Sequence, residues 1–283
     1  MGLRNGDATR RIRGRSRRGY VSPVGPRGDA ERFAALWTAA EPDLEALVSL
    51  VGTVGRDAPD PGALLDGLAE RVSGSVGDGV DGGRVLAVLF GGDGLRGDRS
   101  TYGSPDNSLV DRVLLRRLGI PLSLSVVAVL VGRRLGVPFD AVGMPRHVLL
   151  RDPVAGTLHD VFDGARILDA TGAAELLARI DPGTPWRSEF LESMTAHEIV
   201  DRWCRNLRVA RTAVGDGPGV DRIVGLELSR PDPPPDAVVV AVGRAAGRGA
   251  FAEAASLLER HAPAGPAGVP WRERAQQFRA RLN

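Results

Sequence analysis

Two short segments of the chain hold the residues that could perform acid–base chemistry. The first begins with His147, and the second contains His159 and Asp160, with Asp163 three residues further on. A histidine can take up a proton near neutral pH, and a nearby carboxylate can orient its imidazole ring. Which histidine meets which carboxylate depends on how the two segments pair.

Residues 147–151 and 158–162 have the pattern of two strands joined by a hairpin, since Asp152-Pro153 and Gly156 between them favour a turn. An even-length loop places His147 and Asp160 on one face of the sheet. An odd-length loop gives that face to His159 and Asp163 instead. Because residues 153–156 form a natural four-residue loop, the sequence favours Asp160, with Asp163 as the rival.

Other residues that could bind a metal or perform chemistry give weaker signals. The single cysteine, Cys204, excludes an intramolecular disulfide and a cysteine-rich zinc site. It follows Trp203 in a predicted helix and is expected to be a small buried residue. His197 and His261 lack metal-ligand spacing and are expected at the surface. The glycine-rich stretch 91–98 lacks the Gly-Lys-Ser/Thr ending of a phosphate-binding loop, so we expect a connection there and no cofactor or metal.

Helices are predicted on both sides of these segments. Ser108 with Asp111 is a capping-box pattern that opens a helix ending at Gly119, and an apolar, buried helix follows over 122–135. The other elements follow from their periodicity and turn residues. Helices are expected at 29–40, 43–54, 61–76, 172–180, 194–214, 236–246, 249–261 and 270–281, strands at 139–142, 147–151, 158–162 and 166–168, and a stiff linker at 230–235. A central helix that leads into an antiparallel sheet indicates an α+β fold.

Charge is distributed unevenly along the 283 residues. All 37 basic residues are arginines, and residues 1–19 carry a net charge of +6 while the rest carries −4. This arm has little apolar surface to bury, so we expect it to be disordered and to contact nucleic acid weakly at most. No apolar stretch suits an export signal or a transmembrane helix, so we expect a cytoplasmic protein without membrane contact.

The segment from Tyr102 to Ser125, YGSPDNSLVDRVLLRRLGIPLSLS, resembles the hallmark segment of the SirB-type transglutaminase-like family. The motifs Gly136-Val-Pro, Met144-Pro-Arg-His and His159-Asp-Val-Phe-Asp-Gly follow in the same order, and EIVDRWCRNL (198–207) is similar to the family's post-core helix. The resemblance implies a bacterial-type protein with a transglutaminase-like (papain-like) core and TPR-like helices. It divides the chain into an arm (1–19), an N-terminal helical lead (20–100), the core (101–192), a post-core helix (193–229) and a TPR-like tail (230–283).

The resemblance also implies roles for individual residues. Active members of the superfamily carry a cysteine at the start of the central helix, where the helix N-terminus stabilises a thiolate, with a histidine and an aspartate on adjacent strands. Here that stretch has Ser123 and Ser125 but no cysteine, whereas His147 and Asp160 match the other two positions. Three residues depart from the usual pattern around them: Arg146 for Gly, Val148 for Phe and Val161 for Pro.

Three functions are compatible with these residues. The first is a non-catalytic or chemically altered member, a pseudoenzyme, that binds a peptide or protein partner. The second is an acyl hydrolase or acyltransferase in which Ser123 or Ser125 acts with His147 and Asp160. The third is an interaction scaffold whose TPR-like tail binds the partner while the cleft is vestigial. For each serine, helix capping or burial is the competing structural role.

Overall fold

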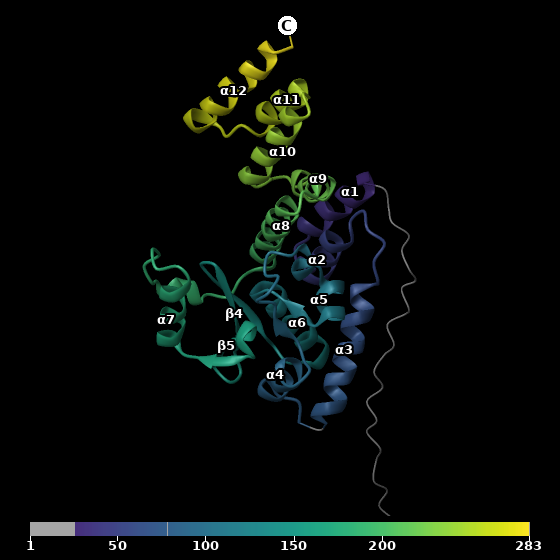
Figure 1. The fold of residues 1–283 in the computed structure, drawn as a ribbon, viewed down its shortest axis with the longest axis vertical. Coiled ribbons are helices and arrows are strands. Elements are labelled where there is room, and N and C mark those ends of the chain that lie inside the picture. Colours follow the sequence, from purple (N-terminus) through teal and green to yellow (C-terminus); the bar gives the residue numbers. More distant parts are fainter. Residues whose placement is uncertain (1–25, 78, 283) are drawn as a thin grey trace, which may run out of the picture.

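The computed structural model describes residues 26–77 and 79–282 (Figure 1). The basic arm predicted over residues 1–19 lies outside the described residues. Helices make up most of the fold, and an antiparallel sheet of four strands lies beside the central helix α6 (Pro121–Leu135). The predicted α+β class is confirmed.

Within the described residues, four helices precede the central part of the fold: α1 (Pro26–Trp37), α2 (Leu44–Thr53), α3 (Pro61–Val76) and α4 (Gly82–Phe90). The start of α3 follows its sequence signal, because the Asp60 carboxylate accepts a hydrogen bond from the N–H of Gly62 at 2.9 Å and Pro61 occupies the first helical position. The Asp81 carboxylate caps α4 in the same way. Local capping chemistry therefore sets where these helices begin.

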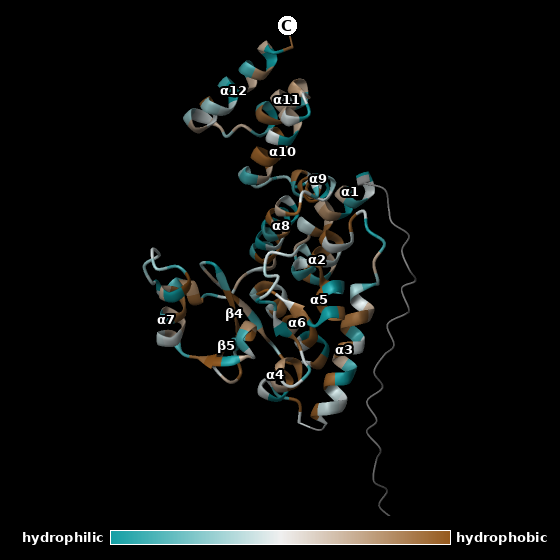
Figure 2. Ribbon diagram, viewed as in Figure 1, coloured by the Kyte–Doolittle hydropathy of each residue, from teal (hydrophilic) through white to brown (hydrophobic). Residues whose placement is uncertain are grey.

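Helix α6 forms the centre of the main hydrophobic core. All of its residues from Pro121 to Gly132 are buried, and Figure 2 shows how apolar this helix is. It contacts α3, α4, α5 (Val110–Arg116) and two strands of the sheet. It ends at Gly136, whose φ of 72° is a left-handed conformation that glycine adopts readily. The prediction of a buried helix over 122–135 is correct to within one residue.

The beginning of α5 differs from its prediction. Its N-cap is Leu109, without a side-chain cap, and Ser108 is the last residue of the 3-10 helix η1 (Pro105–Ser108). The Asp111 carboxylate does not form a capping box, because it accepts a hydrogen bond from Arg56 at 3.0 Å. A contact with a distant part of the chain has replaced the local one.

The end of α5 also differs from its prediction. The chain leaves the helix at Arg117, which has a left-handed φ of 56°, so the expected stop at Gly119 is wrong. Gly119 instead lies in β2 (Leu118–Gly119), which pairs in parallel with β1 (Arg96–Gly97). This short pairing fixes the segment after α4 against the residues that lead into α6.

The four strands of the sheet follow one another in chain order: β3 (Asp140–Met144), β4 (His147–Asp152), β5 (Thr157–Asp160) and β6 (Arg166–Leu168). Asp152 pairs with Thr157, so the loop between β4 and β5 has the four residues that the sequence favoured. On the outer side of β3, Val142 forms an isolated antiparallel bridge with Ser193. The chain thus returns to the sheet before entering α8 (Ala196–Ala213).

The two faces of the sheet pack against different helices. Val148 and Leu150 belong to the main core around α6, whereas Leu149 and Leu158 join a second cluster with α7 (Ala170–Ile180). Successive residues of a strand point to opposite faces, which explains this separation. Helices α6 and α7 accordingly cover opposite faces of the sheet (Figure 1).

The remaining helices are α9 (Gly217–Leu228), α10 (Pro235–Gly247), α11 (Phe251–His261) and α12 (Val269–Ala280). Helix α9 was not predicted from the sequence as a separate helix. Helices α10, α11 and α12 project from the rest of the molecule and have a hydrophobic cluster of their own (Figure 1). None of the helices formed by the described residues combines the length and apolar character needed to cross a membrane.

Candidate functional site

His147 and Asp160 form a buried pair on neighbouring strands. The Nε2 atom of His147 lies 3.0 Å from Oδ1 of Asp160. Both side chains are almost fully buried, with exposed fractions of 9% and 4%. The same carboxylate oxygen accepts a hydrogen bond at 3.2 Å from the N–H of Phe162, in the 3-10 helix η2 (Val161–Asp163). The Asp160 carboxylate therefore binds the imidazole of His147 and also caps the start of η2.

The surroundings of Asp160 keep it ionised. Burial would raise the pKa of Asp160, but the hydrogen bond and charge of His147, the N–H of Phe162 and the charge of Arg166 together lower it below its usual value. An ionised carboxylate only accepts hydrogen bonds, so Nε2 of His147 carries the proton that lies between them. Within the described part of the chain, no hydrogen bond engages Nδ1 of His147. In the neutral imidazole that nitrogen is an acceptor that the pair can offer to a ligand.

The pairing register explains why Asp160, and not Asp163, meets His147. Leu150 pairs with His159, so His147 and Asp160 share a face of the sheet and His159 belongs to the other. His159 contacts the hydroxyl of Thr157 at 2.8 Å and the carbonyl of Ala165 at 3.2 Å.

Asp163 is half-exposed and forms ion pairs with two arginines. It accepts a hydrogen bond from Arg99 at 2.8 Å, and its carboxylate lies 3.3 Å from the guanidinium of Arg166. In the structure, Asp160 and not its rival Asp163 is the carboxylate that meets His147.

A tight turn places His147 at the start of β4. Met144 pairs with His147, leaving Pro145 and Arg146 as the two loop residues. Arg146 has a φ of 58°, a left-handed conformation in which glycine is favoured over other residues. This conformation gives a physical reason for the glycine that the resemblance led us to expect at this position.

Ser123 caps the helix in which it lies. Its Oγ accepts a hydrogen bond from the N–H of Ile120 at 3.0 Å and donates one to the carbonyl of Ile120 at 3.1 Å. The residue is 1% exposed. Gly119 is close as well, because a Cβ added there would lie 2.7 Å from the Ser123 hydroxyl. In the described structure no hydrogen bond joins Ser123 to His147.

Ser125 and Cys204 are also separate from the pair. The Ser125 hydroxyl is buried and finds no hydrogen-bond partner among the described residues. Cys204 lies on α8 and is buried, as expected for a small core residue. Burial, followed by the charges of Glu227 and Asp201, raises the pKa of its thiol well above the usual value. A thiol in that environment stays protonated and is a poor nucleophile.

Two histidines expected at the surface are half-buried instead. His197 contacts the carbonyl of Trp37 through Nε2 at 2.9 Å, and its ring centre lies 4.3 Å from that of the indole. Burial, and then the charge of Arg260, lowers the pKa of His261. The residues that the structure describes contain no group of three or more histidine, cysteine or acidic side chains suited to hold a metal ion.

Aromatic rings border the histidine–aspartate pair. The ring of Phe162 meets His147 edge-on at 6.3 Å and Tyr102 edge-on at 5.8 Å. Tyr102 is 48% exposed, so this border is open to solvent. Gly97 of β1 lies directly against Phe162, and Gly97 pairs with Gly119 just before α6. These contacts connect the pair to the segment from which α6 begins.

A buried network that the sequence analysis missed holds the segment carrying Tyr102. The carboxylate of Asp98 accepts hydrogen bonds from the N–H of Thr101 at 2.8 Å and from Arg116 at 2.9 Å. Asn107 accepts a hydrogen bond from Arg116 at 3.1 Å and donates one to the carbonyl of Thr101 at 2.7 Å. Burial would raise the pKa of Asp98, but these donors together lower it. The spacing of Asp98 and Thr101 around a turn is the sequence signal that could have revealed the local part of this network.

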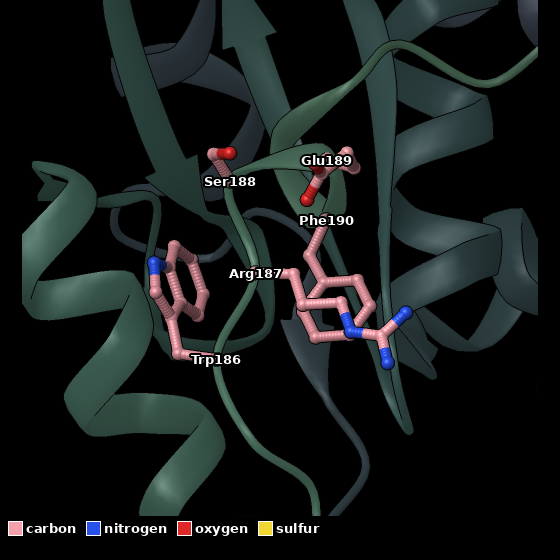
Figure 3. Close-up of a pocket in the computed structure, with 5 residues that line it drawn as sticks. All are labelled: Trp186, Arg187, Ser188, Glu189 and Phe190. Carbon is pink, nitrogen blue, oxygen red and sulfur yellow. The ribbon is translucent and has the colours of Figure 1, made fainter.

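A shallow groove lies on the segment between α7 and α8. It encloses about 750 Å³ and is lined by Trp186, Arg187, Ser188, Glu189 and Phe190 (Figure 3). The rings of Trp186 and Phe190 meet edge-on at 6.1 Å and pack against the cluster that contains α7. The groove is thus part of the α7 layer of the fold.

Comparison with known proteins agrees with this architecture. Residues 62–205, from α3 into α8, match the family model described as "Transglutaminase-like superfamily". A "UPF0162 protein" of Xylella fastidiosa (strain Temecula1) is 34% identical over 168 residues, which cover 52% of this chain and 56% of that protein. A "UPF0162 protein" of Pseudomonas aeruginosa is 31% identical over 195 residues, covering 65% of each chain.

A more distant relative is the human "F-box only protein 21", which is 38% identical over 92 residues, or 32% of this chain and 14% of that protein. The matches thus span less than two thirds of these relatives. No solved structure matches the chain significantly. Because the family model covers half of the sequence and includes α6, the four strands and the start of α8, the chain belongs to the transglutaminase-like superfamily.

Proposed function

We propose that this protein binds a segment of a peptide or protein partner beside His147 and Asp160, and that it lacks the thiol chemistry of active transglutaminase-like enzymes. In this proposal Asp160 positions His147, and His147 offers Nδ1 as a hydrogen-bond acceptor. Ser123 occupies the place of the catalytic cysteine and acts as a helix cap. Tyr102 and Phe162 supply aromatic surface for the ligand.

The observation that carries the proposal is the engagement of the Ser123 hydroxyl. It uses both its donor and its acceptor with Ile120, and it is buried. A serine nucleophile needs its proton removed by a base within hydrogen-bond reach. A serine hydroxyl is also far less acidic than a thiol, so the helix N-terminus alone does not ionise it. The only thiol of the chain, Cys204, is buried on α8.

The surface next to His147 supports binding of a peptide rather than of a compact metabolite. It combines the half-exposed ring of Tyr102 with the guanidinium of Arg99, which lies 5.1 Å from the centre of the Phe162 ring. Aromatic and arginine side chains are the residues most enriched at protein-binding sites.

Two finer assignments rest on sequence pattern. We assign the chain to the SirB-type branch from the segment between Tyr102 and Ser125, and we regard α10, α11 and α12 as TPR-like helices that support the partner or bind it themselves. A cytoplasmic location is part of the same proposal.

A fluorophosphonate probe separates binding from serine chemistry. We expect no labelling of the wild-type protein above that of Ser123→Ala, with Ser125→Ala as the matched control. Labelling that disappears in Ser123→Ala and also in His147→Ala would contradict the proposal and establish a Ser/His/Asp acyl hydrolase or acyltransferase.

Binding is tested with an array of peptides of random sequence. We expect a subset to bind the wild-type protein, and Tyr102→Ala to weaken that binding at least fivefold. Val239→Asp, on the exposed surface of α10, is the control and should bind normally. If Val239→Asp abolishes binding while Tyr102→Ala has no effect, the tail is the binding element and the scaffold hypothesis replaces this one.

A further inference from the structure

The guanidinium of Arg202 lies at the end of the sheet where β4 begins with His147. Arg202 belongs to α8, and its Nη1 donates a hydrogen bond to the carbonyl of Met144 at 2.8 Å. Met144 is the residue that pairs with His147 across β3 and β4. Paired residues on adjacent strands are about 5 Å apart. Arg202 therefore reaches the same end of the sheet as His147, but from a different helix.

Arg202 has no acidic partner among the described residues, unlike four other arginines of this region. The neighbouring guanidiniums pair with carboxylates as follows: Arg99 with Asp163 at 2.8 Å, Arg146 with Asp181 at 3.4 Å, Arg166 with Asp163 at 3.3 Å, and Arg205 with Asp236 at 3.2 Å. Among residues 26–77 and 79–282, no carboxylate lies within ion-pair distance of Arg202. In the part of the chain that the structure describes, its one hydrogen bond is the bond to the carbonyl of Met144.

The absence of a counter-ion is notable because Arg202 is not fully exposed. Burial lowers the pKa of Arg202, and the charge of Arg205 lowers it further, while the neighbouring Tyr102 acts in the opposite direction. A desolvated charge is unfavourable unless a group of opposite charge accompanies it. Tyr102, close enough to interact with this charge, is half-exposed. Arg202 is half-buried, so its charge is partly withdrawn from water next to a tyrosine that solvent reaches.

We infer that Arg202 is the binding residue for a carboxylate of the peptide that occupies this site, with the Tyr102 hydroxyl as a second donor. Arginine presents five N–H donors in a planar fork that matches a carboxylate, and one of them is used by Met144. The carboxylate comes either from the C-terminus of the peptide or from an aspartate or glutamate side chain. This inference rests on the proposed peptide-binding function and specifies the ligand's chemistry.

The test compares how strongly the intact protein binds three random-sequence peptide arrays that differ in their carboxylates. The first has free C-termini, the second has C-terminal amides, and the third has amides and no acidic residues. We expect binding to require a carboxylate, so the third form should bind at least tenfold more weakly than the first. A loss between the first and second forms identifies a C-terminal carboxylate, and a loss only in the third identifies an acidic side chain.

Variants assign the effect to Arg202. Arg202→Gln should weaken binding of the free-acid peptides at least tenfold and abolish the difference between acidic and neutral forms. Arg202→Lys keeps the charge without the planar fork and should weaken binding at least threefold, which keeps the test decisive if Arg202→Gln does not fold. Arg205→Gln, one turn away and exposed, should bind within twofold of wild type.

The outcomes separate the two proposals. Equal binding of all three forms, lost in Tyr102→Ala, would overturn the role of Arg202 and leave the peptide site standing. Carboxylate-dependent binding that is unchanged in both Arg202 variants would also overturn it. If no peptide binds in any form, both proposals are wrong.

Discussion

Gly97 lies so close to Phe162 that a methyl group could not be added between them. A Cβ at Gly97 would lie 2.5 Å from the carbonyl oxygen of Phe162 and 2.6 Å from its ring. The backbone N–H of Phe162 binds Asp160, which in turn holds His147. Because Gly97 pairs with Gly119 just before α6, the absence of a side chain at Gly97 lets Phe162 pack closely against β1.

Gly97→Ala should lower the free energy of unfolding by about 1–3 kcal/mol, because the new methyl group must push the backbone at Phe162 away. Gly103→Ala is the matched control in the same part of the chain, since nothing lies within 4 Å of a Cβ there. It should change stability by less than about 0.5 kcal/mol. Urea unfolding measures both. Similar effects for the two variants would show that the contact at Gly97 relaxes freely.

Ser123→Ala and Ser125→Ala should differ although the two serines are neighbours on α6. Ser123→Ala removes a cap hydrogen bond and should cost about 1 kcal/mol of unfolding free energy. Ser125→Ala removes a buried hydroxyl that has no partner in the described structure, so it should be neutral or slightly stabilising. Thermal unfolding of the two variants and of wild type measures this difference in stability. A larger loss for Ser125→Ala would reverse the assigned roles.

Arg146→Gly should raise the unfolding free energy by about 1 kcal/mol, because it relieves a left-handed residue in the turn before His147. The substitution also removes the contact with Asp181, but Arg146 is 72% exposed there and such pairs contribute little. Arg146→Ala is the control: it loses the same contact, keeps the strained conformation, and should remain within about 0.5 kcal/mol of wild type. If both variants behave alike, the left-handed conformation of Arg146 does not reduce stability.

Glu227 should make the protein lose stability as the pH rises from about 4.5 to about 7. It is 1% exposed on α9, and burial raises its pKa from 4.5 to about 7 despite the guanidinium of Arg208 at 2.8 Å. Since the folded state holds the proton more tightly, the stabilisation is fully present below pH 4.5 and disappears as the pH passes 7. The difference is roughly 3 kcal/mol.

Glu227→Gln should remove this dependence, so its stability relative to wild type should increase across that pH range. Arg208 keeps its other partner, Asp236, at 2.8 Å. Urea unfolding at several pH values measures the effect, with Glu70→Gln on the exposed surface of α3 as the control. If wild type and Glu227→Gln show parallel pH profiles, Glu227 does not titrate in this range.

The sequence predicted best those features that short stretches of chain determine. Asp60 and Pro61 are adjacent residues that define the start of α3, and the four residues between Asp152 and Thr157 set the register that brings His147 to Asp160. Both depend on local geometry, which a sequence contains directly. The catalytic or binding role of that pair remains a prediction.

The features that were missed depend on distant residues. Ser108 and Asp111 have capping-box spacing, but Arg56, 55 positions before Asp111, takes the carboxylate. The partnership of Asp98 with Arg116 also becomes apparent only when β1 and α5 come together. Local propensity could not predict these outcomes, because tertiary ion pairs compete with the local hydrogen bonds.

The two margins of the sheet have a consequence for self-association. On one side, the N–H of Met194 donates to the carbonyl of Ala141 at 2.8 Å, and the bridge to Ser193 occupies the margin of β3. On the other side, β6 has only three residues and begins with the charged Arg166. The chain then leaves the sheet and enters α7 two residues after β6 ends. Short, charged or covered margins prevent strands of another molecule from adding to a sheet. The fold therefore resists edge-to-edge aggregation at the sheet that carries His147 and Asp160.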